Sequence, residues 1–148
     1  MTHRERICIV DDDISSLSVM RLILLGMGYT AIEPFNDARD AWEYIRLEKP
    51  SLVISDWNMD PLSGLDLLKL VRNSKSTSSI PFLMVTANIS EDYWLRAIKE
   101  GVTEFLFKPY ELSAFRDAVT ITSAHTIDHE RLADPLRREY GYFTAAHW

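Results

Sequence analysis

Side chains suited to metal binding and phosphoryl chemistry recur at four points in the chain, each directly after a short apolar run. They are Asp11, Asp12 and Asp13, then Asp56, then Thr86, then Lys108. Carboxylates that lie close together repel one another, and a hard divalent cation such as Mg²⁺ relieves that repulsion. A lysine beside them would offset the charge of phosphoryl oxygens. If the fold brings these residues together, their types predict Mg²⁺-assisted transfer of a phosphoryl group to a carboxylate.

The segments between these points alternate between two patterns. Short apolar runs rich in β-branched residues predict strands at 7–10, 29–35, 52–55, 81–85 and 105–107. Apolar residues at helical spacing predict helices at 17–25, 37–47, 65–71, 93–98 and 112–122. This alternation predicts an α/β fold, a doubly wound five-stranded parallel sheet, in which the carboxyl ends of the strands share one edge. We expect Ser15 or Ser16 to cap the first helix, with Asp13 as a helix-start residue rather than a metal ligand.

Length and composition limit the classes of protein that fit. The 148 residues include 16 Lys and Arg against 22 Asp and Glu, and 47% are hydrophobic. These are ordinary values for one globular domain, and the net charge of −6 argues against nucleic acid binding, which needs a basic face. The single cysteine, Cys8, cannot form an internal disulfide, and no apolar run approaches the ~20 residues of a membrane span. We therefore expect a cytoplasmic protein that binds neither nucleic acid nor membranes.

The polar residues also belong to a series of short motifs. In chain order they are Ile-Val-Asp-Asp at 9–12, Ser-Asp-Trp-Asn-Met at 55–59, Gly64, Met-Val-Thr-Ala at 84–87 and Phe-Lys-Pro at 107–109. Their order and spacing resemble those of a two-component response-regulator receiver domain, close in pattern to the stand-alone chemotaxis regulators. The resemblance covers residues 5–124 and implies a flavodoxin-like receiver fold.

The resemblance implies a phosphoacceptor site. Asp56 would accept a phosphoryl group from a sensor histidine kinase or a phosphotransfer protein. Asp11, Asp12, Asp56 and the backbone carbonyl of Asn58 would hold Mg²⁺, while Lys108 would pair with Asp56 and then with the phosphoryl group. Such a protein is a signalling protein rather than an enzyme, because it catalyses only its own phosphorylation and dephosphorylation.

A second set of residues is implied to respond to the phosphoryl group. Thr86 would move to hydrogen-bond a phosphoryl oxygen, and Phe105 stands where the family has an aromatic switch that swings inward. The peptide bond before Pro109 is expected to be cis. We further expect Asn58 and Asn88, two residues after Asp56 and Thr86, to flank the path of the attacking water and to modulate hydrolysis.

Two positions depart from the family pattern. Most members have proline directly after the methionine of the Asp56 motif, whereas here Asp60 precedes Pro61, which predicts a loop of different shape. Phe105 replaces the more usual tyrosine and lacks its hydroxyl group. Neither departure removes a residue implied to bind the metal or the phosphoryl group.

Residues 125–148 lie beyond the resemblance. Their apolar residues follow helical spacing after Asp134-Pro135, a helix-start signal, so we expect a partly helical extension. It would pack on its own domain or on a second copy in a homodimer. With no output domain expected, the signal would pass through a protein-binding surface on residues 91–124.

Two other functions also fit parts of the sequence. The aspartates at 11–13 contain the Asp-x-Asp of a Mg²⁺-dependent haloacid-dehalogenase-type phosphatase, which would make Asp11 the nucleophile and leave Asp56 and Thr86 without a role. A receiver-like scaffold that is never phosphorylated would keep the fold but would show no Mg²⁺ affinity.

Overall fold

A single parallel sheet with the strand order β2-β1-β3-β4-β5 forms the centre of the protein. The computed structural model describes residues 3–88 and 90–124. The strands are β1 (His3–Val10), β2 (Tyr29–Phe35), β3 (Leu52–Asp56), β4 (Phe82–Thr86) and β5 (Glu104–Phe107). The helices are α1 (Ile14–Gly26), α2 (Ala38–Glu48), α3 (Gly64–Asn73), α4 (Glu91–Lys99) and α5 (Leu112–Ser123). The predicted doubly wound α/β fold is thereby confirmed.

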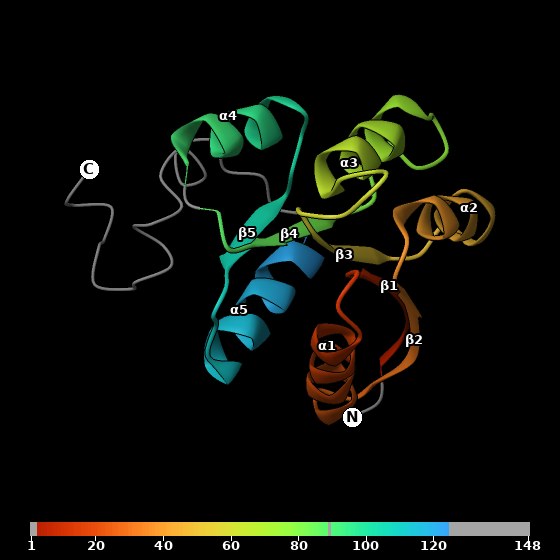
Figure 1. Ribbon diagram of the computed structural model, residues 1–148. Helices are drawn as coiled ribbons and strands as arrows, with labels where there is room; N and C mark the ends of the chain where they lie inside the picture. The colour runs from red at the N-terminus through yellow and green to blue at the C-terminus, as the bar shows by residue number, and fades with distance from the viewer. Residues whose placement is uncertain (1–2, 89, 125–148) are drawn as a thin grey trace.

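The helices cover the two faces of the sheet in separate layers. Figure 1 shows α1 and α5 on one face, and α2, α3 and α4 on the other. Because side chains alternate along a strand, Ile7 and Ile9 pack toward α1 and α5, whereas Cys8 and Val10 pack toward α2–α4. Burial on both faces explains the nearly continuous apolar strands, and it raises the pKa of the Cys8 thiol, as expected for a core residue. No helix of the described residues is long and apolar enough to span a bilayer.

The start of the chain differs from the prediction in two details. β1 begins at His3 rather than at Ile7, because its polar first half pairs with β2 outside the apolar core. The helix α1 is capped by Asp13 and not by Ser15 or Ser16. The Asp13 carboxylate accepts hydrogen bonds from the Ser15 amide and the Ser16 hydroxyl, each at 3.0 Å. The serines therefore donate to the cap, which confirms Asp13 as a helix-start residue.

A partly buried arginine connects the end of α3 to the segments that lead into β4 and β5. Arg72 donates to the Gly101 carbonyl at 2.9 Å and to the Ile80 carbonyl at 2.6 Å, before β5 and β4 respectively. Burial lowers the pKa of the Arg72 guanidinium. These contacts satisfy carbonyl groups that would otherwise lack donors between the helix and the strands. The predicted extension at 125–148 lies outside the described residues.

Candidate functional site

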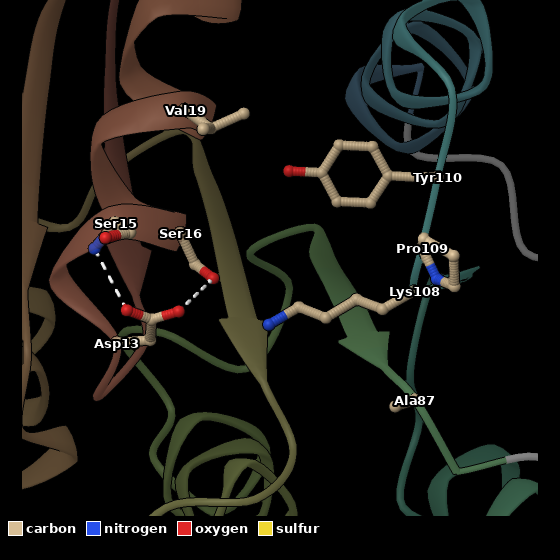
Figure 2. A pocket seen from close by; sticks show the side chains of 8 residues that line it. All are labelled: Asp13, Ser15, Ser16, Val19, Ala87, Lys108, Pro109 and Tyr110. Carbon is tan, nitrogen blue, oxygen red and sulfur yellow. Dashed lines mark hydrogen bonds between the residues drawn. The ribbon is translucent and has the colours of Figure 1, made fainter.

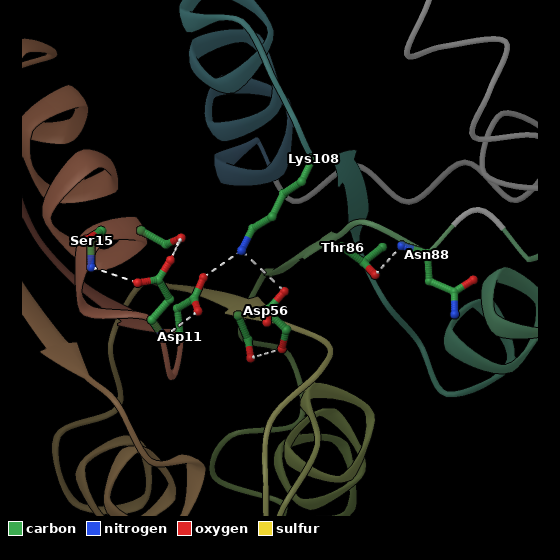
Figure 3. Close-up of polar contacts among 9 residues, drawn as sticks. Asp11, Ser15, Asp56, Thr86, Asn88 and Lys108 are labelled. Carbon is green, nitrogen blue, oxygen red and sulfur yellow. Dashed lines mark hydrogen bonds and ion pairs between the residues drawn. The ribbon is translucent and has the colours of Figure 1, made fainter.

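The carboxyl ends of β1, β3 and β5 bring three acids and one lysine together. Asp11, Asp12 and Asp56 each place a carboxylate oxygen within 4.8 Å of the others. The Lys108 ammonium donates to the Asp11 carboxylate at 2.7 Å and lies 3.5 Å from the Asp56 carboxylate. Figure 3 shows the lysine reaching from the β5 side to both carboxylates. The sheet edge thus collects the residues that the sequence pattern predicts there.

Asp11 is fixed by its own backbone and by the turn that follows it. Its amide donates to the Phe35 carbonyl at 3.0 Å, which continues the pairing of β1 with β2. Its carboxylate accepts the Asp13 amide at 2.9 Å in addition to Lys108. The Asp11 side chain is buried, whereas Asp12 is exposed at the rim of the site. One carboxylate is therefore rigidly held, and the other remains open to solvent.

The backbone around Asp56 is held from three sides. The Ser55 hydroxyl donates to the Asp56 carbonyl at 2.8 Å, and the Trp57 amide donates to the Val85 carbonyl at 3.1 Å. Gly64 opens α3 directly against this segment, and a Cβ atom there would lie only 2.2 Å from the Asp56 carbonyl oxygen. Only glycine permits that close approach, which explains its place in the motif.

The electrostatic environment of Asp56 favours the uncharged acid. Burial raises the pKa of Asp56 to about 6, the Lys108 ammonium opposes the rise, and the charge of Asp11 adds to it. For Lys108, burial acts to lower the pKa, but the hydrogen bond to Asp11 and the charge of Asp56 leave it raised. The lysine therefore stays charged, yet it does not fully compensate the two buried acids. An additional cation at this edge would be stabilised.

A comparison with known protein families matches residues 7–120 to the response regulator receiver domain. The chain belongs to this family. The chain is 28% identical to the chemotaxis protein CheY of Pseudomonas aeruginosa, over 77% of this chain and 92% of that protein. It is also 32% identical to the transcriptional regulatory protein ZraR of Klebsiella oxytoca over 86% of its length, but it spans only 27% of that regulator.

Solved structures agree with this assignment. The receiver domain superposes on the chemotaxis response regulator CheY4 of Vibrio cholerae with a TM-score of 0.76 and 26% identity, covering 81% of this chain and 99% of that one. It is a CheY-type receiver of two-component signalling, with the flavodoxin-like receiver fold. No comparison favours the haloacid-dehalogenase alternative.

The residues implied to respond to phosphorylation lie beside the acid cluster. The Thr86 hydroxyl accepts the Asn88 amide at 3.0 Å, and the Asn88 side chain accepts the Ser90 amide at 2.8 Å. Figure 3 shows this pair to one side of Asp56. Phe105 is buried in the core, opposite Met84 in the strand register. Asn58 is exposed, and the roles of these side chains stay predictions.

Two cis peptide bonds lie beside the site in the part of the chain that the structure describes. The bond between Lys108 and Pro109 is cis, as predicted. The bond between Asp60 and Pro61 is also cis, in the loop that departs from the family pattern. The sequence predicts a different shape for this loop but does not specify the form of that bond.

A pocket next to the acid cluster was not predicted. It has a volume of about 460 Å³ and lies between α1 and the segment after β5. Figure 2 shows Lys108 entering it from one side, with Ser16 and Val19 of α1 across from Tyr110. Tyr110 directly follows the Lys-Pro motif, which is the only sequence signal for its place. The pocket gives a bulky group access to the region of Lys108.

Proposed function

We propose that Asp56 is the phosphoacceptor of this receiver domain, and that its donor is the phosphohistidine of a sensor kinase or a phosphotransfer protein. The observation that carries the proposal is the position of the Lys108 ammonium, in contact with Asp11 and 3.5 Å from Asp56. A nucleophilic carboxylate beside a fixed cation is the arrangement that phosphoryl transfer requires. The family membership supports the same assignment.

The acid cluster fits Mg²⁺. Its ligands are carboxylate oxygens within 4.8 Å of one another, and hard divalent cations prefer oxygen ligands. Asp12 and Asp56 would bind it directly, Asp11 mainly through water, and Asn58 through its backbone carbonyl. When bound, Mg²⁺ neutralises charge on the phosphoryl oxygens.

The chain's own residues would then position the reaction. A carboxylate oxygen of Asp56 attacks phosphorus while the bond from phosphorus to the donor's imidazole nitrogen breaks, and the imidazole leaves as the neutral ring after taking up a proton. Lys108 moves from its pairing with Asp56 to a phosphoryl oxygen and keeps its contact with Asp11. The pocket between α1 and Tyr110 admits the donor group. These roles require a charged lysine, which agrees with its raised pKa.

Phosphorylation would change a surface rather than start a turnover reaction. Thr86 would exchange its bond from the Asn88 amide for one to the phosphoryl group, and Phe105 would respond as the aromatic switch. The surface on residues 91–124 would then bind a target protein. Asn58 and Asn88 would influence how fast water removes the phosphoryl group. We assign this activity to a domain of residues 5–124 acting in the cytoplasm.

The proposal is tested with a small phosphodonor. The protein is incubated with acetyl phosphate and Mg²⁺, and intact mass is measured for the wild type, for Asp56→Asn and for Asp13→Asn. Wild type and Asp13→Asn should gain one phosphoryl group, because Asp13 is occupied as a helix cap. Asp56→Asn should gain none. Phosphorylation of Asp56→Asn, or none of the wild type, would refute the assignment, and the latter result would favour the scaffold.

A further inference from the structure

Two consecutive aromatic residues on α4 contact the two strand ends that carry the reacting groups. Tyr93 stacks on Trp57 with ring centroids 4.9 Å apart and planes 14° apart. Trp94 meets Phe107 edge to face, with centroids 5.9 Å apart and an interplanar angle of 64°. Both geometries are favourable for aromatic pairs. The helix is therefore attached to β3 and β5 through four rings.

The positions of the ring partners give these contacts their significance. Trp57 directly follows Asp56, and Phe107 directly precedes Lys108. Trp57, Trp94 and Phe107 are all buried in the same cluster, so none of these rings can shift without displacing its neighbours. A displacement of α4 would therefore move the backbone next to Asp56 and Lys108, the two residues proposed to contact the phosphoryl group.

A chain of hydrogen bonds connects Thr86 to the same turn of the helix. The Thr86 hydroxyl accepts the Asn88 amide, the Asn88 side chain accepts the Ser90 amide, and the Ser90 carbonyl accepts the Tyr93 amide at 3.1 Å. Ser90 precedes α4 but makes no side-chain cap bond. When Thr86 gives up its bond with Asn88, the first turn of α4 loses this support. The stack on Trp57 then holds that turn.

The rings of α4 are held unequally. The Tyr93 ring stacks on Trp57, and the Arg96 guanidinium lies 5.5 Å from the centroid of the Tyr93 ring. Trp94, by contrast, buries its indole N–H with no acceptor among the described residues. A buried donor without an acceptor is destabilising, and a rearranged helix can relieve it. Both rings therefore hold the observed position of α4, and Tyr93 holds it more firmly, because the unpaired N–H offsets part of the contact between Trp94 and Phe107.

We propose that Tyr93 and Trp94 form an aromatic bridge to Trp57 and Phe107 that holds α4 in its unphosphorylated position, and that this bridge restrains phosphorylation of Asp56. The inference rests on the proposed function. It adds a connection between α4 and Asp56 that passes through Trp57 and not through Thr86 or Phe105. Tyr93 is a positioning residue, since it acts through Trp57. Because coupling is reciprocal, a protein that displaces α4 changes the reactivity of Asp56.

The bridge is tested by the initial rate of phosphorylation with acetyl phosphate and saturating Mg²⁺. Tyr93→Leu removes the ring but keeps an apolar side chain and a good helix former, and it should raise the rate about two- to tenfold, the range of an aromatic pair. Tyr93→Phe keeps the ring, and Leu47→Ala alters an exposed side chain of α2, outside the surface on residues 91–124, so both should match the wild type. The affinity for Mg²⁺, measured by calorimetry, should be the same in all four proteins.

Each other outcome contradicts the bridge. An unchanged or lower rate in Tyr93→Leu overturns it, as does a Tyr93→Phe rate equal to that of Tyr93→Leu. A change of Mg²⁺ affinity in Tyr93→Leu would show damage to the acid cluster instead of a restraint. In the wild type, phosphorylation should speed hydrogen exchange of the α4 amides, and unchanged exchange overturns the bridge even if the variant does not fold. A wild type that takes up no phosphoryl group overturns the proposed function itself.

Discussion

Replacing the carboxylate of Asp56, the proposed phosphoacceptor, should stabilise the metal-free protein. Asp56 is buried beside Asp11, and Lys108 contacts Asp11 more closely than it contacts Asp56. Ionisation of Asp56 therefore works against folding at neutral pH. Asp56→Asn keeps the size and polarity of the side chain and removes this charge, so the variant should unfold at a higher urea concentration than the wild type.

The magnitude follows from the shifted pKa. The ordinary value is 3.8, and burial raises the pKa of Asp56 to about 6. At ~1.4 kcal/mol per unit, ionisation costs up to about 3 kcal/mol in the folded protein relative to the unfolded chain. The folded state holds the proton more tightly, so the wild type loses stability as pH rises from about 4 to about 6, and the full loss persists above that range. We expect Asp56→Asn to gain about 1–3 kcal/mol at pH 7.5 and much less at pH 4.5.

The assay is urea unfolding in EDTA, followed by circular dichroism at the two pH values. Asp60→Asn serves as the matched control, because this exposed carboxylate lies in the loop that follows Asp56. Its effect on the free energy of unfolding should stay within about 0.5 kcal/mol. Mg²⁺ at 100 times its dissociation constant should stabilise the wild type by about 2.7 kcal/mol and Asp56→Asn by less. A destabilised Asp56→Asn at pH 7.5, or an equal difference at both pH values, would refute the reasoning.

Other perturbations test the supports of the site. Gly64→Ala should lower the free energy of unfolding in urea by about 3 kcal/mol or more, because its Cβ would lie 2.2 Å from the Asp56 carbonyl oxygen. Gly26→Ala has open space and should leave that free energy unchanged, and equal losses in the two variants would contradict this. Lys108→Met removes the cation 2.7 Å from Asp11 and should tighten Mg²⁺ binding about fivefold by calorimetry, the effect of ~1 kcal/mol; weaker binding would count against it. Arg72→Met removes the donor to three carbonyls, those of Gly101, Ser78 and Ile80, and should lower the free energy of unfolding by about 2 kcal/mol. A negligible loss would show that water replaces the guanidinium.

The strands and helices were predictable because each carries a strong apolar pattern. The buried runs of β3 and β4 have few alternatives to a central parallel strand, and their carboxyl ends necessarily share an edge. The first four residues of β1 were missed because polar residues there pair with β2 without entering the core. The cap of α1 was misassigned because Asp13 and the two serines are all good caps, and only the backbone geometry distinguishes them.

Contacts between distant elements were less accessible from the sequence. Helical spacing predicted a helix that contains Tyr93 and Trp94, but it does not identify the rings that these two residues contact. Likewise, the spacing of Asn88 after Thr86 predicts a place beside the water path, which stays a prediction, and it gives no sign that the Asn88 side chain accepts the Ser90 amide. Such choices depend on the distance between α4 and β3, which no local pattern encodes.

The uneven contacts of Lys108 also imply an order of events at the site. The Lys108 ammonium lies 2.7 Å from the Asp11 carboxylate and 3.5 Å from the Asp56 carboxylate, so the charge of Asp56, the proposed phosphoacceptor, is the less compensated of the two. At neutral pH its charge is unfavourable, and an incoming dianionic phosphoryl group would increase the repulsion. A cation bound to Asp12 and Asp56 removes both obstacles. Cation binding should therefore precede phosphoryl transfer. Because the charge of Asp56 is unfavourable in the folded protein, a bound cation should increase the reactivity of this carboxylate.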